Sequence, residues 1–152
     1  MTVFTAGCDN YPKDVEHSFD TIKASQHIRV GVIVQSPWVI ENATHLSGIE
    51  IEIISALATS LDVTPQWHVL SEAQATLLLE QYKLDVVIGG LTGDNPRKNS
   101  IAFTRPYLEK NNGQNRHVMA VPKGENRLMV TLERFLSTHK ATTHTLYQQA
   151  AR

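Results

Sequence analysis

Short apolar runs alternate with helical patterns from residue 28 onward, and this alternation restricts the chain to few folds. Residues 28–34 are a β-branched run typical of a buried parallel strand. Residues 49–61 repeat apolar side chains at helical spacing, which predicts an amphipathic helix. Strands are also predicted at 65–70 and 84–89, with a helix over 71–82 between them that begins with a predicted capping box of Ser71 and Gln74. Such alternation indicates a parallel α/β sheet with right-handed crossover connections.

The pattern changes after the third predicted strand. Asn111-Asn112-Gly113 is typical of a tight hairpin, because Asn-Gly accepts the positive φ values of a type I′ turn. We expect residues 117–121 to return antiparallel to residues 102–108 and to lead into a helix over 125–139. The predicted fold class is therefore α/β, a single three-layer lobe with a mainly parallel sheet and one antiparallel strand.

Composition and charge exclude several classes of function. The 152 residues suit one domain, and 14 Lys and Arg against 15 Asp and Glu provide no basic surface for nucleic acid. No apolar stretch is long enough to cross a bilayer. The seven histidines show no pair at i,i+4 spacing and no cluster with cysteine, so we expect no metal site and no cofactor.

A glycine-rich segment, residues 89–97, follows the third predicted strand. Gly90 lets a ligand approach the backbone closely, and Thr92 adds a hydroxyl group and an N–H. Arg97 brings a guanidinium group that can hold a carboxylate through two parallel hydrogen bonds, although a surface arginine in a salt bridge is the simpler alternative. These residues predict a site for a small anion.

Topology supports the same place in the fold. In open α/β sheets, ligands bind beyond the carboxyl ends of the strands. The segments that follow the three predicted strands are residues 35–38, 70–71 and 89–97. We therefore expect these three loops to meet in one site.

The same residues resemble a known family. Gly-Leu-Thr at 90–92, the arginine five positions after Thr92, and Ile-Ala-Phe-Thr-Arg-Pro-Tyr at 101–107 are similar to the signature of family 3 extracellular solute-binding proteins, the amino-acid receptors of ABC importers. The likeness runs from about residue 28 to residue 136. It implies a type II periplasmic-binding-protein fold, and it implies that Thr92 and Arg97 hold the α-carboxylate of an amino acid.

Three more residues complete the predicted ligand site with Gly90, Thr92 and Arg97. Trp38 is expected to contact the ligand's side chain, with an indole that covers the sheet edge as the alternative. Gln35 stands where many relatives carry an aromatic residue, and Leu70 ends the second strand. No catalytic residue is predicted, because Asp94 is the one carboxylate in these loops. A dehydratase or lyase, as among relatives of this fold, is therefore the less favoured alternative.

Three other polar residues are given structural roles. Glu50 begins a predicted helix, where the helix dipole favours an acid. Asp85 is interpreted as a turn residue before the third strand. His117 is interpreted as an ordinary polar residue at the rim of the sheet.

Members of the resembled family are clamps of two lobes, and here one lobe is missing. Only residues 110–116 separate the strand that would leave for the second lobe from the strand that would return. We therefore predict a single solute-binding lobe over 27–140, with a C-terminal tail over 141–152. Binding should be weak, because half a clamp leaves one face of the ligand in water and an exposed ion pair contributes about 0–1 kcal/mol. The freed surface makes a homodimer or another interaction module the alternative, while an ABC permease is the implied partner of the full receptor.

The first 26 residues are polar and are interpreted as a leader or tether, with a short helix near residues 18–24. Thr5-Ala6-Gly7-Cys8 resembles the end of a bacterial lipoprotein signal, in which the cysteine is lipidated. That resemblance implies a periplasmic or other extracytoplasmic protein tethered to a membrane. An ordinary flexible N-terminus is the alternative.

Overall fold

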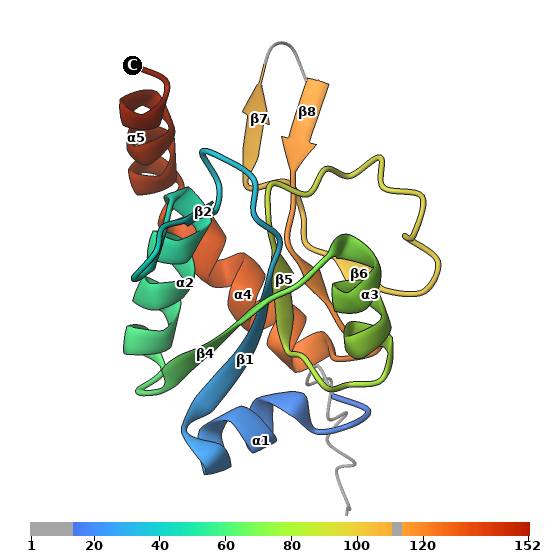
Figure 1. The fold of residues 1–152 in the computed structure, drawn as a ribbon. Helices are drawn as coiled ribbons and strands as arrows, with labels where there is room; N and C mark the ends of the chain where they lie inside the picture. The colour runs from blue at the N-terminus through green and yellow to red at the C-terminus, as the bar shows by residue number, and fades with distance from the viewer. Residues whose placement is uncertain (1–13, 111–113) are drawn as a thin grey trace, which may run out of the picture.

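The computed structural model describes residues 14–110 and 114–152. A five-stranded sheet with the order β4-β1-β5-β9-β6 forms its centre (Figure 1). Strands β4, β1 and β5 run parallel, while β9 is antiparallel to both of its neighbours. The predicted sheet, mainly parallel with one antiparallel strand, is confirmed. The strands are β1 (His27–Val32), β4 (Thr64–Val69), β5 (Val86–Ile88), β6 (Ala102–Phe103) and β9 (Ala120–Val121).

Helices cover both faces of this sheet and make the three layers. Helices α2 and α4 lie against one face and α3 lies against the other (Figure 1). The predicted capping box of α3 is present, since the Ser71 side chain accepts from the N–H of Gln74 and the Gln74 side chain accepts from the N–H of Ser71. The helices are α1 (Ser18–Ser25), α2 (Ile49–Ser60), α3 (Glu72–Glu80), α4 (Asn126–Thr138) and α5 (Lys140–Ala150).

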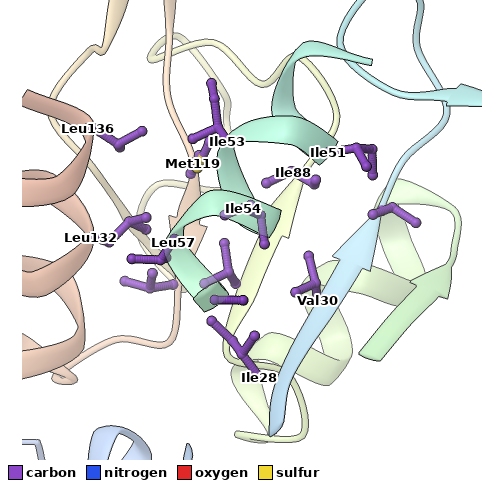
Figure 2. Packing of buried hydrophobic residues seen from close by; sticks show 14 of the residues in the cluster. Ile28, Val30, Ile51, Ile53, Ile54, Leu57, Ile88, Met119, Leu132 and Leu136 are labelled. Carbon is purple, nitrogen blue, oxygen red and sulfur yellow. The ribbon is translucent and has the colours of Figure 1, made fainter. Parts of the chain in front are cut away.

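Alternation along the strands divides the core between the two faces. Val86 and Ile88 of β5 pack in the cluster under α2 and α4, whereas Val87 packs in the cluster under α3. Figure 2 shows the larger cluster, in which Ile54 of α2 and Leu132 of α4 lie close to the sheet. Full burial of each such side chain contributes about 1.5–3 kcal/mol. This packing holds the strands whose carboxyl ends carry the loops.

Two short ladders lie outside the main sheet. Strands β2 (Ile40–Glu41) and β3 (Leu46–Ser47) pair next to the start of α2. Strands β7 (Leu108–Lys110) and β8 (Gln114–His117) form a hairpin that rises beyond the main sheet (Figure 1). The hairpin strands include residues 110 and 114–116, which were assigned to a turn, and the predicted Asn-Gly turn at 111–113 lies outside the described residues.

Residues 14–26 belong to the folded lobe, which differs from the tether expected there. Asp14 accepts a hydrogen bond from the N–H of Arg127, at the start of α4, at 2.6 Å. In return, Glu125 accepts one from the N–H of Ser18, at the start of α1, at 3.0 Å. Each carboxylate thus satisfies N–H groups at the N-terminus of the other segment's helix. Ile22 of α1 is buried in the main core, which secures the segment.

The C-terminal segment predicted as a tail is the helix α5. It packs on α2 and α4, and Thr143 is buried at that contact. Leu146 and Tyr147 are half-buried against the main core. The end of α5 extends beyond the carboxyl edge of the sheet, beside the β7–β8 hairpin (Figure 1).

Asp85 lies in a bend just before β5, as interpreted, but sequence reasoning missed that it is buried and paired with an arginine. Its carboxylate accepts hydrogen bonds from the Arg29 guanidinium group at 2.7 and 3.1 Å and from the Arg29 N–H at 2.7 Å. Asp85 precedes β5, so this pair lies at the amino end of the parallel strands, away from their carboxyl ends. It links β1 to the residue before β5 and is no part of the predicted ligand site.

Candidate functional site

An open cleft of about 500 Å³ lies beyond the carboxyl ends of β1 and β5. The loop after β1 and the loop after β5 both contribute to it, as expected. Gln35, Trp38, Gly90 and Thr92 are the predicted site residues that the cleft brings together. The full lining is Gln35, Ser36, Pro37, Trp38, Gly90, Thr92, His117, Tyr147, Ala150 and Ala151.

The loop after β1 is a tight turn fixed to the start of α2. Gln35 and Val39 exchange backbone hydrogen bonds of 3.0 and 2.9 Å, which close the turn around Trp38. The N–H of Glu50, in the first turn of α2, donates to the Trp38 carbonyl oxygen at 3.0 Å. Because N–H groups in the first turn of a helix lack partners within the helix, this contact satisfies the helix and the loop together.

Glu50 also holds the loop after β5. Its carboxylate accepts hydrogen bonds from the N–H of Gly89 at 2.6 Å, from the N–H of Gly90 at 2.9 Å and from the Tyr107 hydroxyl. Glu50 is fully buried, and this burial raises its pKa, while hydrogen bonds from Tyr107, Gly90 and Gly89 act against the rise. Tyr107 is buried too, and burial with the neighbouring Glu50 charge raises its pKa well above the usual value.

The interpretation of Glu50 as an acid at a helix start is confirmed, but sequence reasoning missed its burial and its hydrogen bonds to the loop after β5. The sequence contains a signal for its burial. Glu50 precedes Ile53, Ile54 and Leu57 by three, four and seven residues, so it shares their buried helix face. A carboxylate on that face needs donors from another segment, and the glycine turn supplies them.

Gly90 brings the two loops into direct contact. Its φ is 68°, and a Cβ atom built there would lie 2.3 Å from Cδ1 of Trp38. Glycine is thus required by the backbone conformation and by the close indole. The Gly90 N–H is already bonded to Glu50, and the Trp38 indole occupies the space that a side chain at Gly90 would need, so Gly90 serves to join the two loops.

Two other rings pack against Trp38. The ring centroids of Trp38 and His117 are 3.9 Å apart, and those of Trp38 and Tyr147 are 5.6 Å apart with the planes 16° from parallel. Trp38 is only 5% exposed. This burial fits an indole that covers the sheet edge better than an indole that is free to contact a ligand's side chain. His117 is also buried, in contrast to the expected polar rim residue. Sequence reasoning missed both ring partners of Trp38.

Thr92 is half-buried in a loop tied to the β7–β8 hairpin. It forms an isolated antiparallel bridge with His117, and the N–H of Gly93 donates to the Arg116 carbonyl oxygen at 3.0 Å. The N–H of Val118 donates to the carbonyl oxygen of Leu91 at 3.0 Å. The hairpin in this way holds Thr92 at the cleft.

Two predicted residues, Leu70 and Arg97, do not line the cleft. Leu70 packs with the cluster under α3. The loop that carries Arg97 turns toward α3, where the Asn95 amide donates to Glu72 at 3.0 Å (Figure 1). Arg97 is half-buried, and within the described residues its guanidinium group has no recorded hydrogen bond or ion pair.

The described residues contain no group of three or more His, Cys, Asp or Glu side chains placed to hold a metal ion. Within 14–110 and 114–152, no helix has the length and apolar character needed to cross a membrane. Cys8, the proposed lipidation site, lies outside the described residues.

Comparison with known proteins bears on the family and the fold. Residues 28–149 match the model of a family described as bacterial extracellular solute-binding proteins, family 3. No curated protein matches the chain.

Many solved structures share the fold, and three of them serve as examples. The arginine-bound form of domain 1 from TmArgBP is 24% identical, has a TM-score of 0.73, and matches 78% of this chain and 98% of its own. An ancestral amino-acid-binding protein, AncCDT-1, described as a precursor of cyclohexadienyl dehydratase, is 15% identical with a TM-score of 0.78, over 89% of this chain and 100% of its own. An amino acid ABC transporter substrate-binding protein from Streptococcus pneumoniae, bound to L-arginine, is 12% identical with a TM-score of 0.78, over 88% of this chain and 97% of its own.

Proposed function

Because this chain belongs to family 3 of the bacterial extracellular solute-binding proteins, we propose that its cleft binds an amino acid or a similar small carboxylate. The observation that carries this proposal is the convergence of Gln35, Trp38, Gly90 and Thr92 on one cleft. The strand order supports it, since the chain passes from β1 to β4 on one side and then to β5 on the other. Ligands of open α/β sheets bind at such a switch point.

In this proposal the ligand's carboxylate is held by Thr92 and Arg97. Thr92 lines the cleft. Arg97 follows five residues later in the same loop, and its guanidinium group has no ion-pair partner recorded in the described part of the chain. A guanidinium group binds a carboxylate through two parallel hydrogen bonds, so a shift of the loop that brings Arg97 to the cleft would complete the site.

We expect weak binding, with a dissociation constant near the millimolar range and a binding free energy of about −4 kcal/mol. The cleft is open, and β7 and β8 are joined by three residues where a clamp would insert its second lobe. The similar TmArgBP structure is described as an arginine-bound domain 1, which supports ligand capture by a single lobe.

The proposed binding function also implies a partner and a location. In a full receptor this lobe would deliver its ligand to an ABC permease, outside the cytoplasm, and lipidation of Cys8 would tether it to the membrane. The family's description as extracellular supports the location. Immunoblotting of membrane and soluble fractions from cells that express the natural gene, with a Cys8→Ser variant as the control, tests the tether.

One observation favours a second candidate, an interaction or dimerisation module. Val34 lies just after the end of β1, and Val69 is the last residue of the adjacent strand β4. Each of these two side chains is 46% exposed. Apolar side chains at the edge that a second lobe would cover invite association. Light scattering at increasing protein concentration tests this candidate. A catalytic role has less support, because none of the ten described residues that line the cleft is a carboxylate.

Heteronuclear NMR titration tests the binding function. Uniformly labelled protein should show saturable shifts at Gly90, Thr92 and Arg97 with L-arginine or L-glutamine. Agmatine, which is arginine without its carboxyl group, should leave these signals in place, because the carboxylate is the group that the loop holds. Equal shifts with agmatine, or none with a panel of all common amino acids, would overturn the proposal.

A further inference from the structure

We propose that helix α5 forms the second wall of the ligand cleft, and that Tyr147 and Ala150 contact the side chain of the bound ligand. This inference rests on the proposed amino-acid-binding function. Tyr147, Ala150 and Ala151 line the same cleft as Gly90 and Thr92. A ligand whose carboxylate lies at Thr92 therefore has α5 as a neighbour.

The spacing along α5 places the wall on one helix face. Tyr147, Ala150 and Ala151 are related by three and four residues, so they project from the same side. Thr143 and Leu146 precede Tyr147 and Ala150 by four residues and are packed against the lobe. The first part of this face therefore anchors the helix, and its continuation reaches the cleft.

The wall is continuous with the loop after β1. Tyr147 stacks on Trp38, and Trp38 is fixed by Gly90 and by the start of α2. This chain of contacts gives Tyr147 a set position at the cleft. A single lobe in this way obtains a surface on the side of the ligand that a partner lobe would otherwise face.

The chemistry of the wall indicates the class of ligand. None of the ten lining residues, all of them within the described part, is Asp, Glu, Lys or Arg. Tyr147 and the two alanines offer an aromatic ring and methyl groups. A ligand with an uncharged side chain, apolar or amide, suits this wall better than a charged one, which would lose water without gaining a partner.

Replacing each of two alanines of α5 by tryptophan tests whether this helix forms a wall of the cleft. Ala150 and Ala141 are both exposed and lie nine residues apart, about 2.5 turns, so they occupy opposite helix faces. With the full chain and L-glutamine as the probe, Ala150→Trp should fill the cleft and raise the dissociation constant at least about tenfold, whereas Ala141→Trp should change it less than about twofold. Tyr147→Ala should weaken binding about fivefold. Circular dichroism should show all three variants folded.

Each other outcome has a defined meaning. Equal affinity of Ala150→Trp and the unchanged protein would overturn the wall and leave the binding function standing. Tighter binding by Tyr147→Ala would show α5 to be a cover that competes with the ligand, which also overturns the wall. Binding of L-arginine without binding of L-glutamine would overturn the uncharged class alone. Absence of binding by the unchanged protein and every variant, with both amino acids, would refute the proposed function itself.

Discussion

The carboxylate of Glu50 accepts a hydrogen bond from the N–H of Gly90 at 2.9 Å. The N–H of Glu50 at the same time donates to the carbonyl oxygen of Trp38 at 3.0 Å. One buried residue therefore joins the two loops that form the cleft. The geometry of the candidate site depends on a polar group in the core as well as on apolar packing.

Replacing Glu50 by Gln should change how stability varies with pH. Burial raises the pKa of Glu50 from its ordinary value of 4.5, against the opposing hydrogen bonds from Tyr107, Gly90 and Gly89. The folded protein keeps a proton that the unfolded chain releases near pH 4.5. The contribution of this residue is thus complete below that pH and is lost as pH rises through the folded-state pKa.

Urea unfolding from about pH 4 to about pH 8 checks this prediction. The free energy of unfolding of the unchanged protein should fall relative to that of Glu50→Gln as pH rises. Two parallel curves would show that the pKa of Glu50 is not raised in the folded state.

Gly90→Ala should destabilise the protein, and Gly93→Ala in the same loop should not. At Gly90 the φ of 68° is unfavourable for alanine, and the new Cβ would lie 2.3 Å from Trp38. A left-handed residue costs about 1–2 kcal/mol and overpacking about 1–3 kcal/mol, so we expect a loss of about 2–4 kcal/mol. A Cβ at Gly93 meets nothing within 4 Å. Chemical denaturation of the two variants measures the difference, and equal stabilities would refute the contact with Trp38.

Asp14→Ala should lower the free energy of unfolding by about 2 kcal/mol, because helix-capping side chains contribute about 0.5–2 kcal/mol each and Asp14 serves two helices. It accepts hydrogen bonds from Phe19 in α1 at 2.8 Å and from Arg127 in α4 at 2.6 Å. Asp94→Ala, at an exposed loop position, is the matched control and should cost less than about 0.5 kcal/mol. An Asp14→Ala variant as stable as the control would mean that residues 14–26 are a tether after all.

The sheet and its helices were predictable because their signals are local. The apolar residues within 28–34 and within 49–61 follow patterns typical of a strand and of a helix. These patterns can be recognised without knowing which other segments pack against them. The Ser71–Gln74 capping box was readable for the same reason, since its partners are three residues apart. Topology then placed the loops after β1 and β5 at one edge of the sheet.

The errors concern contacts between distant segments. Asp14 and Glu125 pair across more than one hundred residues, so the polar N-terminal segment looked like a tether. Helix α5 is rich in threonine and glutamine, and its contact with the cleft comes from Tyr147 packing against Trp38. Composition alone carries no information on such pairs.

Within the candidate site, the glycine turn and Thr92 were found because both follow a strand directly. The position of Arg97 depends on where its loop turns, and the contact between Asn95 and Glu72 directs that loop toward α3. Spacing from Thr92 predicts that the two residues share a loop, but the direction of the loop is set by a side chain on another helix.

Charge removal at two adjacent cations of this loop tests the central claim most directly. NMR titration with L-glutamine should show that Arg97→Gln weakens binding about fivefold, because an exposed ion pair with the ligand's carboxylate contributes up to about 1 kcal/mol. Lys98→Gln, which removes the same charge from the exposed neighbouring residue, should leave the affinity within about twofold. Equal affinities of the two variants would contradict the assignment of Arg97 as the residue that holds the carboxylate.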